Sequence, residues 1–379
     1  MMRTVSLSDI CTKIASGGTP LTKRDDYYGG DIPWLRTQEI NFGNIYSTEK
    51  TITELGLKNS SAKIIPKDSV IVAMYGATAG KSAINKIPLT TNQACCNLII
   101  DNSKADYRFV YYYLVNSYEK LLSAAVGAAQ QNLGSKQISA MTINLPPLDQ
   151  QKKIADVLSS LDEKIELNRR MNETLEQLGQ ALFRHYFVDN PEAKSWYKKP
   201  LDEIANFLNG LAMQKYPKIN GQPTLPVIKI REMSSGITDS TDIASDNIPE
   251  EYIVRDGDLL FSWSGTLMVK FWSGGDGALN QHLFKVTSDK YPEWLYYYWV
   301  KYHLDQFILI AKSKATTMGH IQRKHLKQAE VIVPPNIEEM TSEFTPIIDQ
   351  IKTNLFETNC LVNIRDLLLP KLISGEIKI

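Results

Sequence analysis

The sequence predicts an α+β protein in which two copies of one globular unit are each followed by a long helix. Three observations lead to this prediction. Matching segments recur in the same order in both halves, short β-type runs alternate with Gly, Pro, Asn and Asp, and each half ends in a heptad-like stretch. The chain of 379 residues, 43% apolar and 22% charged, is long enough for two ordinary domains with real cores.

The internal repeat is most visible in two tyrosine runs, FVYYYLV at 109–115 and WLYYYWV at 294–300. Other pairs follow in the same order: LSDI (7–10) with LDEI (201–204), IPWLR (32–36) with LPVIK (225–229), IPKDSVIVAMYGAT (65–78) with VRDGDLLFSWSGT (254–266), TNQ (91–93) with LNQ (279–281), and INLPP (143–147) with VIVPP (331–335). A period of roughly 185–195 residues indicates a duplicated domain, because solenoid repeats are much shorter. We therefore predict globular domains at 1–147 and 196–335, a central helix at 148–195 and a C-terminal helix at 336–379.

Each globular domain is expected to combine short strands with helices. Apolar runs at 69–74 and 258–263, bounded by turn residues, predict strands. The tyrosine runs are followed by further apolar residues and predict helices, whose aromatic side chains we expect in the cores. A stacking platform for bases is the alternative interpretation of the same tyrosines.

The stretch after each proline pair has apolar residues at alternating three- and four-residue spacing, which is typical of a coiled-coil seam. The seam positions are Ile154, Leu158, Leu161, Ile165, Asn168, Asn172, Leu175 and Leu182 in the first helix, and Met340, Phe344, Ile347, Ile351, Asn354, Thr358, Leu361 and Leu368 in the second. Asn354 falls where Asn168 falls. We expect the two helices to pack against each other, with the polar positions setting the register. A helix of ~40 residues is ~60 Å long and can act as a spacer.

Composition excludes several classes of protein. No apolar run reaches the ~18–20 residues of a membrane span and the N-terminus lacks the apolar core of a secretory signal, so we expect a cytoplasmic protein without membrane contact. The cysteines (Cys11, Cys95, Cys96, Cys360) show no CxxC pairing, and we expect them to be apolar fillers in a reducing compartment. The histidines lack metal-ligand spacing.

The overall charge is balanced, with Lys plus Arg equal to Asp plus Glu at 42 each. However, residues 120–148 and 306–329 contain basic residues and no acidic ones. Such a segment can bind a polyanion, or it can simply be a solvated face.

No motif predicts an enzyme. Residues 76–82, GATAGKS, follow a predicted strand and resemble a phosphate-binding P-loop. The spacing is one residue short, because the first glycine of the motif would have to be at position 75, which is Tyr75. The second copy has no Gly-Lys-Ser. Thr78 and Lys81 could still contact a DNA phosphate from such a turn. The Asn-Gln pairs at 92–93 and 280–281 could read adenine edges, but their presence in both copies favours a structural role.

Two domains that read different DNA sequences should share a scaffold and differ in their reading loops. The copies diverge at 16–28 against 209–216, at 76–82 against 265–270, and at 130–136 against 316–324. These loops are rich in Lys, Arg, Ser, Thr, Asn and Gln, the side chains that contact phosphates and base edges.

The chain resembles the specificity subunit of type I restriction-modification systems. The motifs that carry the resemblance are SGGTP (16–20), the strand-Gly-Thr turns at 75–78 and 264–266, the Asn-Gln pairs, the proline pairs, LFRHYF (182–187) and LLPKLISGE (368–376). The likeness covers essentially the whole chain and the order of its elements. The second copy departs from it, because NGLAMQK (209–215) stands where SGGTP would be.

The resemblance implies a non-catalytic DNA-binding subunit. In this family each globular unit is a target-recognition domain that reads one half of a split sequence, and two antiparallel spacer helices set the gap. The candidate DNA-binding residues are Lys23, Arg24, Thr78, Lys81, Gln130, Gln131 and Asn132 in the first unit, and Lys215, Thr266, Lys270, Thr316, Thr317, His320, Arg323 and Lys324 in the second.

The resemblance also implies partners. Two methyltransferase (modification) subunits would bind the spacer helices, at Ile154, Leu158, Leu161, Ile165, Met340, Phe344, Ile347 and Ile351, and restriction/translocase subunits would join them. S-adenosylmethionine, ATP and Mg²⁺ are expected on those subunits, with no cofactor and no metal on this chain. Two alternatives stay open. One is a specificity half of a different restriction arrangement, or an orphan subunit that redirects another system's methyltransferase; the other is a duplicated coiled-coil adaptor that binds only protein.

Overall fold

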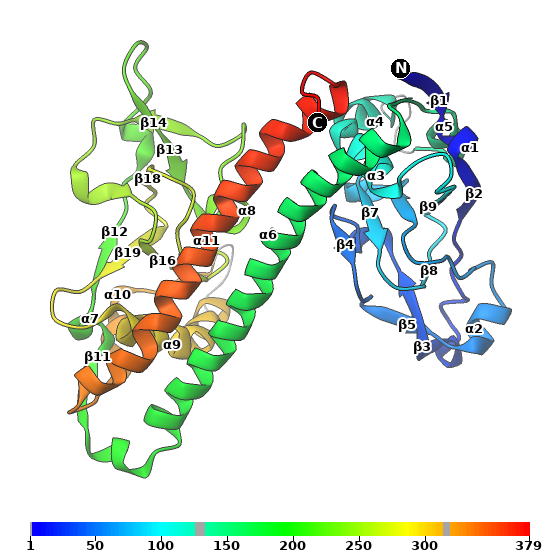
Figure 1. The fold of residues 1–379 in the computed structure, drawn as a ribbon. Coiled ribbons are helices and arrows are strands. Elements are labelled where there is room, and N and C mark those ends of the chain that lie inside the picture. The colour runs from blue at the N-terminus through cyan, green and yellow to red at the C-terminus, as the bar shows by residue number, and fades with distance from the viewer. Residues whose placement is uncertain (1, 126–132, 314–318) are drawn as a thin grey trace. The chain divides into compact units, whose positions relative to one another are not determined.

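The computed structural model describes residues 2–125, 133–313 and 319–379, and the chain forms two compact units (Figure 1). The first unit comprises residues 1–164 and 361–379, and the second comprises residues 165–360. Each unit therefore contains one globular domain together with a stretch of both long helices. None of the helices in the described ranges is long and apolar enough to cross a membrane.

The first unit contains a five-stranded sheet in the order β2-β9-β6-β7-β4, a three-stranded sheet β5-β3-β8 and the pair β1-β10. Its strands are β1 (Arg3–Ser6), β2 (Cys11–Ser16), β3 (Tyr28–Leu35), β4 (Asn44–Ile45), β5 (Lys50–Ile52), β6 (Val70–Ala73), β7 (Ser82–Asn85), β8 (Thr90–Thr91), β9 (Cys95–Ile100) and β10 (Thr142–Leu145). Its helices are α1 (Leu7–Ile10), α2 (Glu54–Lys58), α3 (Tyr107–Asn116), α4 (Tyr118–Ala125) and α5 (Ser135–Ala140), with 3-10 turns η1 (Asp25–Tyr27), η2 (Thr37–Glu39) and η3 (Gly76–Thr78).

The second unit contains the four-stranded sheets β12-β19-β16-β17 and β14-β13-β18-β15 and the pair β11-β20. Its strands are β11 (Tyr197–Pro200), β12 (Asn206–Asn209), β13 (Thr224–Ile228), β14 (Ile243–Ser245), β15 (Ile253–Val254), β16 (Leu259–Ser262), β17 (Val269–Phe271), β18 (Gly277–Leu279), β19 (Leu283–Thr287) and β20 (Glu330–Val333). Its helices are α7 (Leu201–Ile204), α8 (Ile230–Ser235), α9 (Glu293–Ser313) and α10 (Arg323–Gln328), with 3-10 turns η6 (Met213–Lys215) and η7 (Glu250–Tyr252).

The predicted duplication is confirmed at the level of backbone hydrogen bonds. Leu7 N donates to Met141 O in the first unit as Leu201 N donates to Ala329 O in the second, both at 2.9 Å. The parallel pair β3-β8 corresponds to β13-β18, and the antiparallel pair β6-β9 corresponds to β16-β19. The two copies therefore share their central strand order and differ at sheet edges, where β4 extends one sheet of the first unit and β15 extends one of the second. The predicted α+β fold class is correct.

The predicted strands and tyrosine helices form the cores. All residues of β6 and β16 are buried, as expected for apolar runs covered on both faces. Helix α3 begins where the carboxylate of Asp106 accepts the backbone N–H groups of Arg108 and Phe109. Five tyrosines of the two runs are buried at 1–6% exposure and Tyr113 is half-buried against the core, which confirms the predicted core role.

The long helices are α6 (Leu148–Phe183) and α11 (Ile337–Ser374). Each begins within two residues of its proline pair. Helix α6 ends earlier than predicted, because the chain continues as a π-helical turn η4 (Arg184–Val188) and then as a 3-10 turn η5 (Pro191–Ser195). The ring of Pro191 stands at the start of η5, where a missing N–H costs no hydrogen bond.

The two helices run antiparallel in the second unit (Figure 1), and polar side chains join them. Asn168 Nδ2 donates to Glu357 Oε2 (2.8 Å), and Asn354 Nδ2 donates to Asn172 Oδ1 (2.8 Å). Asn168 and Asn354 are buried, at 0% and 2% exposure. The predicted polar seam is therefore real, and each amide can pair only in one register.

In the first unit an ion pair joins the same two helices to the tyrosine helix. Arg365 Nη1 donates to Asp162 Oδ1 (2.9 Å), and Tyr112 Oη donates to Asp162 Oδ2 (2.7 Å). Burial, reinforced by the Asp162 charge, raises the pKa of the Tyr112 hydroxyl. The hydroxyl therefore stays protonated and remains a donor to the carboxylate.

Candidate nucleic-acid interface

Thr78 and Lys81 lie between β6 and β7; Thr78 contacts the neighbouring turn η2, and Lys81 contacts Asn41, two residues after that turn. Thr78 Oγ1 donates to the carbonyl of Thr37 (2.8 Å), and Lys81 Nζ donates to Asn41 Oδ1 (2.5 Å). The Thr78 hydroxyl is thus used inside the protein, whereas Lys81 is held by a surface amide that a phosphate could replace. The structure brings these two predicted residues together.

The loop that resembles a P-loop is a turn between two antiparallel strands. Gly76 and Gly80 have φ angles of 81° and 83°, in the region that glycine adopts without strain. A P-loop leads from a strand into a helix whose N-terminus faces phosphate, but here β7 follows and pairs with β6. The prediction that this segment is no nucleotide-hydrolysis site therefore agrees with its local structure.

Lys23 and Arg24 lie in the turn before η1, and both are exposed. Arg24 forms a bidentate pair with Asp26 (2.7 and 2.8 Å) and its guanidinium lies 4.8 Å from the centre of the Tyr27 ring. The hydrogen bond from Arg24 lowers the pKa of the Asp26 carboxyl. Arg24 would have to exchange this carboxylate for a phosphate in order to contact DNA.

The remaining candidates of the first unit, Gln130, Gln131 and Asn132, lie outside the described residues, as do Thr316 and Thr317 of the second unit.

In the second unit, Lys215, Thr266 and Lys270 are exposed. Lys215 ends η6, Thr266 lies in the turn between β16 and β17, and Lys270 lies on β17. Lys270 Nζ donates to the carbonyl of Met233 in α8 (3.0 Å), so this ammonium connects β17 to that helix.

The turn of Thr266 contacts the segment of His320. Gly265 N donates to Gly319 O (2.9 Å), and Ser264 pairs with His320 in an isolated antiparallel bridge. Two candidates from distant parts of the sequence are therefore brought together at one end of the sheet.

Arg323 and Lys324 begin helix α10. Arg323 Nη2 donates to the carbonyl of Phe207 (3.3 Å), and its guanidinium lies 5.9 Å from the centre of the Phe284 ring. Lys324 is exposed on the first turn of the helix. The Arg323 guanidinium thus makes structural contacts within the chain, and its predicted phosphate contact would come in addition to them. Lys324 is exposed and is predicted to bind a phosphate through its charge.

The sequence interpretation missed a pair of acid-capped turns beside these loops. Arg36 N donates to Glu39 Oε1 (3.0 Å), and Lys229 N donates to Glu232 Oε2 (3.2 Å). The side chain of Arg36 also pairs with Glu49. The repeat could have revealed these turns, because both copies have a basic residue three positions before a glutamate, as RTQE at 36–39 and KIRE at 229–232.

The asparagines of the Asn-Gln pairs close turns. Asn92 Oδ1 accepts the N–H of Ala94 (3.2 Å), and Asn280 Oδ1 accepts the N–H of His282 (3.3 Å). The same side-chain-to-backbone bond recurs in both units, which confirms the structural interpretation of these asparagines.

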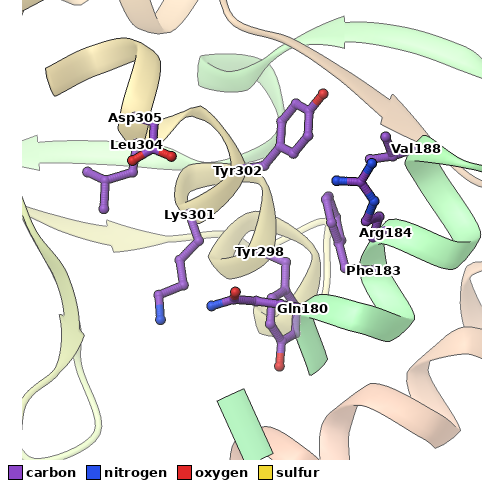
Figure 2. Close-up of a pocket in the computed structure, with 9 residues that line it drawn as sticks. All are labelled: Gln180, Phe183, Arg184, Val188, Tyr298, Lys301, Tyr302, Leu304 and Asp305. Atoms are coloured by element: carbon purple, nitrogen blue, oxygen red, sulfur yellow. The ribbon is translucent and has the colours of Figure 1, made fainter. Parts of the chain in front are cut away.

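A cavity of about 510 Å³ opens beside the end of α6 in the second unit (Figure 2). Figure 2 shows the side chains that line it: Gln180, Phe183, Arg184, Val188, Tyr298, Lys301, Tyr302, Leu304 and Asp305. Both of its basic groups have acidic partners, since Lys301 pairs with Glu176 (2.7 Å) and Arg184 with Asp189 (3.1 Å). Within the described ranges, no group of three or more His, Cys, Asp or Glu side chains could hold a metal ion.

The residues predicted to contact other subunits require a correction. Five of them are buried inside the chain at 0–6% exposure: Ile154, Leu158, Phe344, Ile347 and Ile351. Leu161, Ile165 and Met340 are half-buried. Each long helix runs through both units, and its apolar side chains pack on the core of the unit in which they lie. For example, the Phe344 ring stacks on the Trp294 ring of α9 with 4.5 Å between the ring centres. Contacts with another subunit would have to come from other faces of α6 and α11.

The described chain thus consists of two copies of one α+β unit, each with candidate DNA-binding residues in its loops, and two long helices. The family model of the type I restriction modification DNA specificity domain matches residues 2–177 and 193–359. The chain belongs to this family, and its role is DNA recognition rather than catalysis.

Relatives of known type agree with this assignment. The chain is 28% identical to the type I restriction enzyme MjaIX specificity subunit of Methanocaldococcus jannaschii, over 97% of this chain and 91% of the relative. It is 24% identical to the EcoKI specificity subunit of Escherichia coli K12, over 93% of this chain and 83% of the relative. In fold it is similar to the crystal structure of the type I restriction-modification S subunit from M. genitalium, with a TM-score of 0.62, 17% identity and coverage of 98% and 96% of the two chains.

Proposed function

We propose that each globular unit reads one half of a split DNA sequence and that α6 and α11 set the number of base pairs between the halves. The internal duplication is the observation that supports this most directly, because two copies of one reader on paired helices can each meet one half-site. Lys81, Lys215 and Lys324 would supply cations for the phosphates.

The same helices would bind two methyltransferase subunits, which restriction/translocase subunits join. Large apolar side chains remain exposed on both helices, at 37–67%: Leu167, Leu178, Phe356, Ile364 and Leu367. Exposed apolar surface on a helix that has already buried its core face is typical of a protein contact. S-adenosylmethionine, ATP and Mg²⁺ would be carried by those partners.

The test is to co-express the chain with the methyltransferase subunit encoded beside it and to map methylated adenines by single-molecule sequencing. A split motif with a constant gap is the expected result. No new methylation from an assembled complex supplied with cofactor would contradict the proposal and favour an adaptor that binds only protein. Such an adaptor would also show no steep fall of log K with log salt in DNA-binding assays.

A further inference from the structure

We propose that the second unit discriminates bases with four side chains at one end of its central sheet: Asn209, Trp263, Ser264 and His282. The inference rests on the proposed function and specifies which residues give the second half-site its sequence. Their ligand would be the edges of nucleobases in duplex DNA. Asn209 belongs to a divergent loop and Trp263 and Ser264 to a repeated segment of the sequence, whereas His282 lay outside the segments singled out there.

Three strands bring these residues together. Asn209 is the last residue of β12, Trp263 and Ser264 follow β16, and His282 precedes β19. The strands are neighbours in the order β12-β19-β16, with Asn209 opposite Phe284 and Ser262 opposite Leu283. The antiparallel pairing therefore places all four residues at the same end of the sheet.

The first unit builds the same backbone at this place. Asn209 opposite Phe284 corresponds to Ser16 opposite Cys96. Three further backbone hydrogen bonds of the second unit have a counterpart in the first. The bond from Trp263 N to His282 O (3.3 Å) corresponds to Met74 N to Ala94 O (2.8 Å), and the bond from Ile321 N to Trp263 O (2.9 Å) corresponds to Leu133 N to Met74 O (2.9 Å). The bond from Leu211 N to Leu279 O (3.0 Å) corresponds to Gly18 N to Thr91 O (2.8 Å). The scaffold at this sheet end is therefore common to both copies.

The side chains on this shared scaffold all differ. The first unit carries Ser16, Met74, Tyr75 and Ala94 at the positions of Asn209, Trp263, Ser264 and His282. The asparagines that close the neighbouring turns are identical, so divergence is not general in this region. A constant backbone with changed side chains is what two readers of different half-sites require.

Hydrogen bonds hold the four side chains in a defined arrangement. Trp263 Nε1 donates to Asn209 Oδ1 (2.9 Å), and Ser264 Oγ shares a hydrogen bond with His282 Nδ1 (3.0 Å). The Trp263 and His282 rings lie 5.8 Å apart. Because Ser264 is 3% exposed, it acts as a buried support that orients the imidazole.

The other three side chains are half-buried, so part of each remains accessible at the surface. With His282 Nδ1 bound to Ser264, the other ring nitrogen lies 3.5 Å from Gln281 Nε2, a long contact that a base edge would replace. The Asn209 amide accepts from Trp263 and donates to the Gly210 carbonyl (3.3 Å), which leaves one N–H and one oxygen lone pair for an adenine edge, and the indole face suits a thymine methyl group. None of the four is a Lys or Arg, so the cluster would contribute to base discrimination more than to attraction for the phosphates.

The experiment replaces the three half-buried side chains of the cluster with their counterparts from the first unit: His282→Ala, Trp263→Met and Asn209→Ser. The shared backbone carries those residues in the first unit, so it should tolerate them. Each variant is co-expressed with the methyltransferase subunit and its methylation motif is mapped. Purified complexes are also tested against a randomised DNA library, since binding data do not require methylation. Thr287→Ala, at the exposed far end of β19, is the control.

We expect relaxed or altered bases in one half-site, with roughly tenfold loss of discrimination, an unchanged other half-site and an unchanged salt slope of binding. Unaltered motifs and library preferences in all three variants, beside a split motif for the wild-type protein, would overturn this inference and leave the proposed function intact. Equal changes in both half-sites would also overturn it. A wild-type complex without any motif would overturn the proposed function and this inference with it.

Discussion

At the scale of single residues, the four cysteines differ in environment. Cys95 and Cys96 are fully buried, as expected of apolar fillers, whereas Cys360 lies exposed on α11 and does not fit that expectation. Burial raises the pKa of the Cys11 and Cys96 thiols to about 12, and it also raises that of Cys95. Only thiolates react readily, so the three raised thiols stay protonated and slow at neutral pH.

We predict that iodoacetamide at pH 8 modifies Cys360 much faster than the other cysteines, by about tenfold or more. Reaction of the buried thiols should rise as the pH approaches 12 or when the protein unfolds. Mass spectrometry of peptides after timed quenching measures the order. Equal rates for Cys96 and Cys360 in the native protein would contradict the burial seen here.

A second prediction concerns phosphate contacts. Lys324→Ala should weaken DNA binding by the assembled complex for all sequences alike, and the slope of log K against log salt should fall by about one. Arg323→Ala should do the same and also lower stability slightly, because its bond to the Phe207 carbonyl is lost. Fluorescence anisotropy at several salt concentrations measures both effects.

The control for this prediction is Lys290→Ala, which removes one exposed positive charge from the turn before α9. It should leave affinity and salt slope near their wild-type values. Normal affinity in both the Arg323 and the Lys324 variants would argue against a phosphate contact at the start of α10. Assembly with the methyltransferase subunit should be unchanged in every case.

At the scale of elements, Gly179 lets α6 approach α9 closely. A Cβ atom at this glycine would lie 1.7 Å from Tyr298 Oη. Gly179→Ala should therefore destabilise the protein by ~1–3 kcal/mol, although alanine normally favours a helix over glycine by ~1 kcal/mol. Tyr298→Phe should partly restore stability to the alanine variant, because it removes the hydroxyl that clashes.

Thermal unfolding of the single and double variants measures this coupling. The buried hydroxyl of Tyr298 lacks a hydrogen-bond partner in the described structure, so Tyr298→Phe alone should be neutral or stabilising. Gln177→Ala, at an exposed position two residues before the glycine, is the control and should change little. Additive effects of the two substitutions would show that Gly179 and Tyr298 are not in contact.

The polar seam between α6 and α11 is the other feature of this scale. Asn172 accepts a bond from Asn354 and donates one to the carbonyl of Ile351 (3.2 Å). Asn172→Ala should cost ~1–3 kcal/mol of unfolding free energy, since a buried amide loses its partner. Denaturant titration checks the value, with the exposed Asn363→Ala as the control. A loss no greater than in that control would contradict a register-setting role.

At the scale of the whole molecule, the length of the helices should set the gap in the recognised sequence. Inserting four residues, about one turn or ~6 Å, into both α6 and α11 should change the number of unspecified base pairs and leave both half-site sequences alone. Methylation mapping of the co-expressed variant measures the outcome. A variant that assembles and methylates but keeps the original gap would show that the length of the helices does not set the number of base pairs between the half-sites.

Residue order by itself determined the duplication, the strand runs, the buried tyrosines and the long helices with their polar seam. Each of these features follows from a local periodicity of apolar residues or from a repeated segment, so it can be predicted without knowing contacts between distant residues. The candidate loops were also found in this way, because they are the places where the two copies diverge.

Only the tertiary structure decided which side chains meet. It assigned the apolar stripe of α6 and α11 to the cores of the chain's own units, because a heptad pattern shows that a face is buried but not what covers it. It also placed Asn209, Trp263 and His282 side by side, although they stand at the ends of three different strands. Strand pairing creates such a cluster, and no period in the sequence encodes it.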